Sequence, residues 1–215
     1  MKPAQFLLFS CVLAGMLCCG ACSKQVLTVG EAGVTQKGSI LRPKPPGTMP
    51  TRLYRKYFIA KGQNSAVPSP FEQSNLTELR YRVIFDSSCV YSTVDPKNQI
   101  DINKLFGFAD NNSFHQVNSA RIGWRWLNDG LELLGYVYNN GTRSFQYITT
   151  VSLFEHHDCF IRVVGGEYIF TVDNSVSITM PRASKNATAQ GYLLFPYFGG
   201  DETAPKNITI LMQRL

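Results

Sequence analysis

The chain lacks a second long apolar run: after residue 22, no stretch approaches the ~20 apolar residues that a membrane-spanning helix needs. It also lacks a run of five basic residues, because the Lys and Arg side chains behind its formal net charge of +6 are spread along the sequence. Neither a nucleic-acid patch nor a polybasic membrane segment is therefore indicated. With 215 residues, of which 44% are hydrophobic and 17% charged, the composition is that of one globular domain with a sizeable core.

Cysteine is concentrated at the N-terminus, where four of the six cysteines lie. Met1-Lys2 is positive, Phe6 to Leu17 is apolar and Gly20-Ala21 is small, which is the order of regions in an export signal. The stretch Cys19-Gly20-Ala21-Cys22 resembles a bacterial lipobox, in which a lipidated cysteine becomes the first residue of the mature protein. This resemblance implies a lipoprotein signal peptide over residues 1–22, lipidation of Cys22, and a lipid-anchored protein of the bacterial cell envelope, periplasmic or on the outer-membrane surface.

Alternatives to this interpretation stay open. The aliphatic residue that a lipobox has three positions before its cysteine is Cys19 here, which leaves Cys18 and Cys19 as other candidates for modification. A cleaved ordinary signal or an uncleaved anchor would fit the same apolar segment. Beyond the signal only Cys89 and Cys159 remain, and outside the cytoplasm they form either a disulfide or two buried free thiols.

Residues 23–51 lack an apolar period and contain a proline-rich run from Arg42 to Pro50. Dense proline favours an extended, solvated backbone, so we expect a flexible linker that holds the folded part away from the membrane, or a leader without that role.

From residue 52 to 215 the pattern is that of β-strands, and no segment has a sustained helical period. A series of short strands with regular turn signals predicts one all-β domain, an antiparallel β-sandwich or barrel. The expected strands are 53–61, 78–85, 89–93, 103–108, three within 119–151, 159–164, 167–172, 175–180, 191–197 and 207–212.

Residues 119–151 hold the strongest hairpin signals. Three runs of β-branched and aromatic residues are joined at Asp129-Gly130 and Asn140-Gly141, dipeptides that readily supply the φ > 0 pair of a type I′ turn. Two-residue loops there predict an antiparallel meander whose inward face forms the core, with the ring of Trp124 covering the space that Gly135 leaves. The expected pairs are Trp126 with Leu133, Trp124 with Gly135 and Ile122 with Val137.

The opposite face of this meander carries arginine and tyrosine, and we expect it to be an accessible hollow. Planar guanidiniums bind hydroxyls or carboxylates and aromatic rings stack on the CH faces of sugars, so this face predicts carbohydrate binding. The alternative is a face where arginines stack on tyrosines and pair with surface acids. The candidate ligand-binding residues are Arg121, Arg125, Tyr136, Tyr138, Arg143 and Tyr147.

The order of features from Ser119 to Met180 resembles the concanavalin A-like (laminin G-like) jelly rolls. The meander is followed by a strand that ends at Gly165-Gly166, and then by Tyr168-Ile169-Phe170-Thr171-Val172-Asp173, which is similar to the Y-x-F-x-V-D/N-G run of that family. Asn174 stands where the family often has glycine. The resemblance implies a single jelly-roll domain, a fold that hosts glycoside hydrolases and polysaccharide lyases.

The motifs of those enzymes are missing or altered. The Glu-x-Asp-x-x-Glu spacing of the hydrolases does not occur, and Glu132 alone is expected to pair with a neighbouring arginine. Instead of the lyases' Gln-(Ile/Val)-His strand motif, Phe114-His115-Gln116-Val117 has these residue types in another order and in an expected loop. A polyuronate lyase that uses the same face is therefore an alternative to a protein that only binds a glycan, and a structural or interaction lipoprotein is another.

No resident metal or cofactor is predicted. Adjacent strand residues point to opposite sides, so we expect His156 and His157 to lie in a solvated turn rather than to share a metal. Calcium is the alternative, because oxygen-rich loops recur at residues 101–103, 110–112, 173–174 and 201–202. The expected partners are a glycan and, through the N-terminal lipid, a membrane; no nucleic acid is expected and no protein partner is identified.

Overall fold

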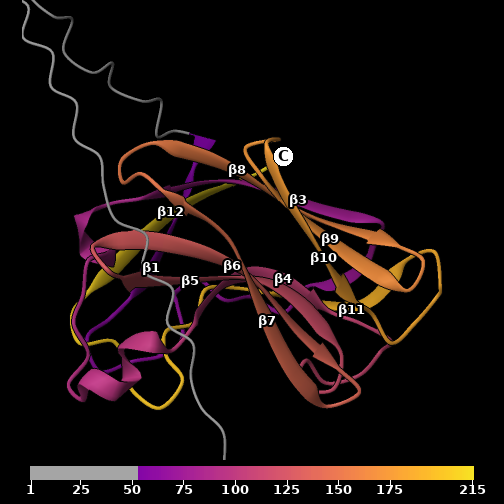
Figure 1. Cartoon of the computed structure of the whole chain (residues 1–215), viewed down its shortest axis with the longest axis horizontal. Coiled ribbons are helices and arrows are strands. Elements are labelled where there is room, and N and C mark those ends of the chain that lie inside the picture. The colour runs from indigo at the N-terminus through magenta and orange to yellow at the C-terminus, as the bar shows by residue number, and fades with distance from the viewer. Residues whose placement is uncertain (1–52) are drawn as a thin grey trace, which may run out of the picture. The chain divides into compact units, whose positions relative to one another are not determined.

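The structure, a computed structural model, describes residues 53–215. In this range twelve strands form two antiparallel sheets that pack against each other (Figure 1). Sheet 1 has the order β1-β12-β3-β8-β9-β10, and sheet 2 has the order β2-β11-β4-β5-β6-β7. The strands are β1 Arg55–Ile59, β2 Gln73–Leu76, β3 Glu78–Phe85, β4 Asn103–Ala109, β5 Ser119–Leu127, β6 Gly130–Asn139, β7 Thr142–Val151, β8 His156–Val164, β9 Glu167–Val172, β10 Val176–Pro181, β11 Ala189–Leu194 and β12 Ile208–Arg214.

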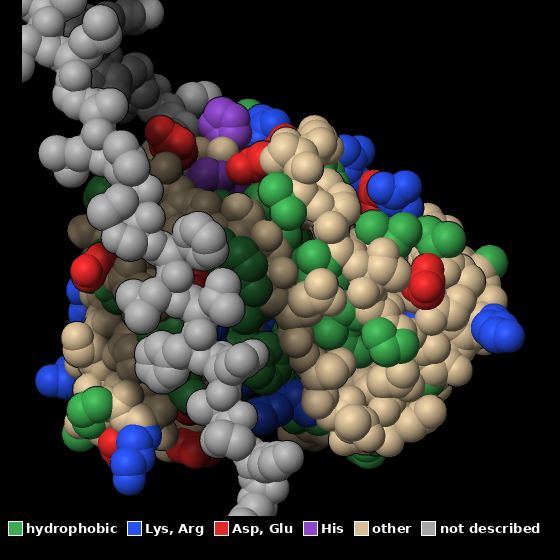
Figure 2. Space-filling view, viewed as in Figure 1, with side chains coloured by type: hydrophobic (Ala, Val, Ile, Leu, Met, Phe, Trp, Pro, Cys, Tyr) green, Lys and Arg blue, Asp and Glu red, His purple; other side chains and the backbone are tan. Residues whose placement is uncertain are grey.

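The predicted all-β antiparallel sandwich is confirmed. Residues 53–215 contain short 3-10 turns, among them η2 (Ser87–Cys89) and η3 (Pro96–Ile100), but no α-helix. On the face shown in Figure 2, Lys and Arg side chains are dispersed rather than gathered into one large patch.

The turn between β5 and β6 is Asn128-Asp129, one residue earlier than the predicted Asp129-Gly130. Both turn residues have positive φ, 51° and 57°, which Asn and Asp tolerate better than other residues with side chains. The predicted pairs are therefore wrong by two residues: Trp124 pairs with Leu133 and Ile122 with Gly135. Because a shift of two residues keeps the parity of side chains, each residue still faces the predicted side.

The inward face of the meander forms the core, as predicted. Trp124 is 0% exposed, and Trp126 packs half-buried against the same core. The space beside Gly135 is filled by the opposite sheet rather than by Trp124, since a Cβ there would lie 2.8 Å from atoms of Ile178 and Met180. The second hairpin turns at Asn140-Gly141 as predicted.

Two local predictions are wrong. Residues 89–93 do not form a strand; the side chain of Asp86 accepts a hydrogen bond from the Ser88 N–H at 2.7 Å and caps the 3-10 turn η2 instead. The pair His156-His157 begins β8 rather than lying in a solvated turn. His157 is buried, and both ring nitrogens have partners: Asp173 Oδ2 lies 2.8 Å from Nδ1, and the Ser152 carbonyl lies 2.9 Å from Nε2.

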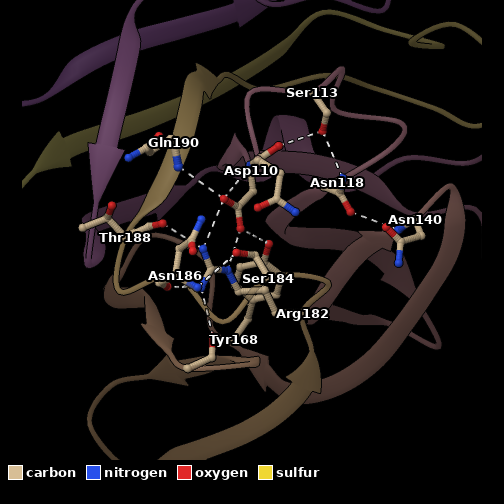
Figure 3. A network of polar contacts seen from close by, with 12 residues as sticks. Asp110, Ser113, Asn118, Asn140, Tyr168, Arg182, Ser184, Asn186, Thr188 and Gln190 are labelled. Atoms are coloured by element: carbon tan, nitrogen blue, oxygen red, sulfur yellow. Dashed lines mark hydrogen bonds and ion pairs between the residues drawn. The ribbon is translucent and has the colours of Figure 1, made fainter.

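A buried ion pair ties the loop between β4 and β5 to the segment after β10. Arg182 Nε donates to Asp110 Oδ2 at 2.6 Å, and the Tyr168 hydroxyl donates to the same oxygen at 2.6 Å (Figure 3). Burial alone would raise the pKa of Asp110, but the hydrogen bonds from Arg182 and Tyr168 hold it below its ordinary value. The network anchors loop 110–118, which borders the candidate site.

Cys89 and Cys159 are free and buried, which decides between the two alternatives for these thiols. The predicted signal peptide with its lipidation site at Cys22 and the predicted linker over residues 23–51 lie outside the described residues. Within residues 53–215, no helix has the length and apolar character to span a membrane.

Candidate functional site

A hollow of about 220 Å³ lies on the outward face of sheet 2, the face to which the alternation assigns arginine and tyrosine. Strands β4, β5 and β6 form its floor, and loop 110–118 and the segment after β11 form its rim. We call it the cationic pocket. The residues that line it are Lys104, His115, Gln116, Ser119, Arg121, Tyr136, Tyr138 and Tyr197.

Arg121 reaches across the pocket floor because a glycine lies beside it. Arg121 of β5 pairs with Gly107 of β4, and a Cβ at Gly107 would lie 2.7 Å from Arg121 Cγ. The missing side chain lets the arginine lie over β4, where its Nη2 donates to the Phe195 carbonyl at 2.6 Å. The expectation of an exposed guanidinium is thereby corrected: Arg121 is only 7% exposed, because the chain around Phe195 covers it.

The positive charge of Arg121 is only partly compensated. Its Nε is buried and has no hydrogen-bond partner among the described residues. Burial lowers the pKa of Arg121 to about 10, and Tyr136 and Tyr197 oppose this shift, so the guanidinium stays charged at neutral pH. A buried cation that lacks a counter-ion favours the binding of an anion.

Lys104 is a second cation in the pocket. Its Nζ donates to the Gly199 carbonyl at 2.7 Å and lies 5.1 Å from the ring centre of Tyr136 and 5.9 Å from that of Tyr197. Burial, followed by the positive charge of Arg121, lowers the pKa of Lys104 to about 8. An anion bound here would favour the charged form, so anion binding and protonation of Lys104 support each other.

Tyr136 and Tyr138 form an aromatic wall of the pocket, on the face where they were predicted. Their ring centres are 5.8 Å apart and their planes are inclined by 68°. Tyr136 is only 4% exposed, and burial raises its pKa to about 12, so its hydroxyl stays protonated at neutral pH.

His115 lies at the rim beside Tyr192 of β11. The Tyr192 hydroxyl is 3.0 Å from His115 Nδ1 and also accepts the His115 backbone N–H at 3.2 Å. Burial, followed by the charge of Arg121, lowers the pKa of His115. The imidazole is therefore neutral at pH 7 and able to accept a proton.

Three of the predicted binding residues do not line the pocket. Arg125 Nε lies 2.7 Å from Glu132 Oε2, which confirms the expected ion pair of Glu132 with a neighbouring arginine. Arg143 and Tyr147 are exposed on β7 at the edge of sheet 2. Of the predicted set, the structure brings together Arg121, Tyr136 and Tyr138.

The remaining lining residues were not predicted as binding residues. The stretch Phe114-His115-Gln116-Val117 does form a loop, as expected, but the loop folds against the face of sheet 2 and places His115 and Gln116 at the pocket. The expected strand 191–197 includes Tyr197, but β11 ends at Leu194, and Tyr197 instead meets Lys104 in an isolated β-bridge.

Within residues 53–215, no three His, Cys, Asp or Glu side chains come together as a set of metal ligands. Calcium binding by the oxygen-rich loops stays an untested alternative.

The two packed sheets define the described domain as an antiparallel β-sandwich. No protein-family model matches the sequence, and no curated protein matches it. Among solved structures, the chain is similar to the alginate lyase AlyC3, with a TM-score of 0.52 and 9% identity over 75% of this chain and 74% of that chain.

Two other solved structures show a lower similarity. For the alginate lyase from Klebsiella pneumoniae the TM-score is 0.49 and the identity 12%, over 64% of this chain but only 57% of the lyase. For the catalytic domain of a laminarinase from Thermotoga petrophila RKU-1 the TM-score is 0.49 and the identity 11%, over 75% of each chain. At such identities the similarity to AlyC3 shows the fold alone.

Proposed function

We propose that the cationic pocket binds an acidic polysaccharide through the carboxylate of a uronate residue. The observation that carries the proposal is the pair of cations, Arg121 and Lys104, in a pocket whose lining residues include no Asp or Glu. A carboxylate fits a planar guanidinium with two parallel hydrogen bonds. A neutral sugar would leave the buried charge unpaired, so the pocket distinguishes ligands by charge.

The other lining residues support the same class of ligand. Tyr136, Tyr138 and Tyr197 offer ring faces for the CH groups of a sugar and hydroxyls for its polar edge. AlyC3, whose fold the chain shares, is an alginate lyase, and alginate is a polyuronate. The proposal for this chain depends on its own pocket rather than on that likeness.

Calorimetric titration with a panel of oligosaccharides tests the proposal. The panel contains hexasaccharides of mannuronate, guluronate and galacturonate, together with neutral cellohexaose and laminarihexaose. We expect at least one uronate to bind and the neutral sugars to show no measurable affinity, because only a carboxylate pairs with Arg121. Equal affinity for neutral and acidic sugars would contradict the proposal.

The pH dependence of that titration provides a second readout. Affinity should fall as the pH rises through about 8, because Lys104, with its pKa lowered to about 8, loses its charge above that pH. Arg121, with its pKa at about 10, keeps its charge over this range. An affinity that stays constant between about pH 7 and 9 would show that the charge of Lys104 does not contribute to binding.

A second candidate function is β-elimination of the bound uronate, and the contact between His115 and Tyr192 beside Arg121 favours it. In this reaction the neutral His115 would take the C5 proton, the C4–O bond would break, and a C4=C5 double bond would form while a tyrosine hydroxyl protonates the leaving oxygen. Arg121 and Lys104 would stabilise the negative charge that develops on the carboxylate.

Ultraviolet absorbance of the unsaturated product tests for this reaction. The wild-type chain is incubated with the polyuronate that binds best in the panel, and absorbance should rise with time. We expect His115→Ala to lower the initial rate about a hundredfold or more, because it removes the base, and to leave binding nearly unchanged. Binding without any rise in absorbance would show a binding protein and not a lyase.

A further inference from the structure

Three hollows lie in a row on the outward face of sheet 2, and the cationic pocket is at one end. The middle hollow, of about 360 Å³, shares His115, Arg121 and Tyr197 with the cationic pocket. The third hollow, of about 370 Å³, shares Phe71 and Tyr192 with the middle one. Because neighbouring hollows share lining residues, they adjoin one another, and we call the row of three hollows the groove.

The far end of this groove is aromatic. Phe71 is 75% exposed and Phe114 is 76% exposed, and both line the third hollow together with Tyr192. The ring centres of Phe71 and Tyr192 are 5.6 Å apart, with their planes inclined by 33°. We call these three residues the aromatic platform. Large apolar side chains that are exposed side by side in a groove are typical of a binding site.

Backbone hydrogen bonds hold the platform in place. The Phe114 carbonyl accepts from the N–H groups of Val117 and Asn118 at 2.8 and 3.2 Å, and the ends of its loop meet where Asp110 N–H donates to the Asn118 carbonyl at 2.9 Å. Phe71 lies just before β2, whose Gln73 pairs with Tyr192 of β11. The folded chain thus presents both phenylalanines to solvent from ordered backbone.

We infer that the aromatic platform binds the CH face of a further sugar residue in the same polyuronate chain whose carboxylate occupies the cationic pocket. The inference rests on the proposed function and adds a requirement for ligand length. Tyr192 stacks near Phe71 on the platform and meets the His115 ring at the pocket rim, with centres 6.2 Å apart. A chain that leaves the pocket through the middle hollow therefore reaches the platform, where its CH groups stack on the rings.

Titration with uronate oligomers of two lengths tests the inference. The double variant Phe71→Ala/Phe114→Ala should lower the affinity for the hexasaccharide about tenfold and leave that for the disaccharide within about twofold. Both side chains are about three-quarters exposed, so their truncation does not disturb the core. Phe154→Ala is the matched control, because Phe154 is 59% exposed and lines none of the three hollows.

The outcomes separate the platform from the proposed function. The double variant could bind the hexasaccharide as tightly as the wild type while Arg121→Gln does not bind it. That result would show that the aromatic platform does not bind the ligand, and it would leave the proposal for the cationic pocket unaffected. If the double variant weakens the disaccharide as much as the hexasaccharide, the platform is no separate subsite and the inference is overturned. If the wild-type chain binds no uronate of either length, the proposed function fails and the inference fails with it.

Discussion

Replacing Arg182 by methionine should lower the free energy of unfolding by about 3–5 kcal/mol, because it leaves the Asp110 carboxylate buried without its cation. The side chains of this pair are 0% and 1% exposed, so water cannot replace the lost partner. Arg182 also donates to the Gly165 carbonyl at 3.0 Å and to the Thr188 carbonyl at 2.8 Å, the latter shown in Figure 3, and both carbonyls lose a donor. Equilibrium urea denaturation measures the change.

The matched control is Arg82→Met. Arg82 also forms a 2.6 Å ion pair, with Asp158, but these side chains are 35% and 20% exposed. Water screens this pair, so its loss should cost no more than about 1 kcal/mol. Adding Asp110→Asn to Arg182→Met should recover part of the stability, because it removes the unpaired buried charge. A loss for Arg182→Met no larger than that for Arg82→Met would contradict the anchoring role of the pair.

The pair also predicts the acid sensitivity of the fold. The pKa of Asp110 in the folded chain lies below its ordinary value of 3.8. The stabilisation that the ion pair provides is therefore fully present when the pH is above the ordinary pKa of 3.8. It is lost as the pH falls through the lowered pKa of the folded chain.

Arg121→Gln should weaken binding of the best uronate hexasaccharide about a hundredfold, since truncation of one partner of a buried, hydrogen-bonded charge pair costs about 2–5 kcal/mol. Glutamine keeps a polar side chain but removes the charge that the carboxylate needs. The same calorimetric titration gives the affinity, and near-ultraviolet circular dichroism checks that the variant is folded.

Arg125→Gln is the control for this prediction. Arg125 lies on the same strand and the same face, but it pairs with Glu132 and does not line the cationic pocket. We expect it to bind with an affinity within about threefold of the wild type. Equal losses for the two variants would mean that the whole face attracts the ligand by its charge and that the pocket does not select it.

Local signals in the sequence predict much of the fold. The alternation of Leu79, Tyr81, Val83 and Phe85 predicts β3, and all four are buried. Gly165-Gly166 predicts the β8–β9 hairpin, and Val164 does pair with Glu167 across it. The predicted position of the turn between β5 and β6 is wrong by one residue. Asn, Asp and Gly all tolerate positive φ, so the local sequence is compatible with a turn at Asn128-Asp129 and with one at Asp129-Gly130.

Only some of the residues that line the cationic pocket can be predicted from local sequence signals. Arg121, Tyr136 and Tyr138 face the pocket because strand periodicity sets the side on which they lie. The same periodicity places Lys104 inward with Phe106 and Phe108, which are both buried. A register shift between Lys104 and Phe106 breaks the alternation, and Lys104 lines the outward pocket instead.

The sequence by itself determined that residues 53–215 are all-β and which side of the meander meets the core, because both depend on alternation and turn residues within a few positions. Only the tertiary structure decided that Arg121 lies buried over Gly107 and that loop 110–118 brings His115 to the pocket. It also decided that Arg125 forms an ion pair with Glu132 and does not line the pocket. Those outcomes depend on contacts between segments far apart in the chain, such as Asp110 with Arg182 and Arg121 with Phe195, for which no local pattern exists.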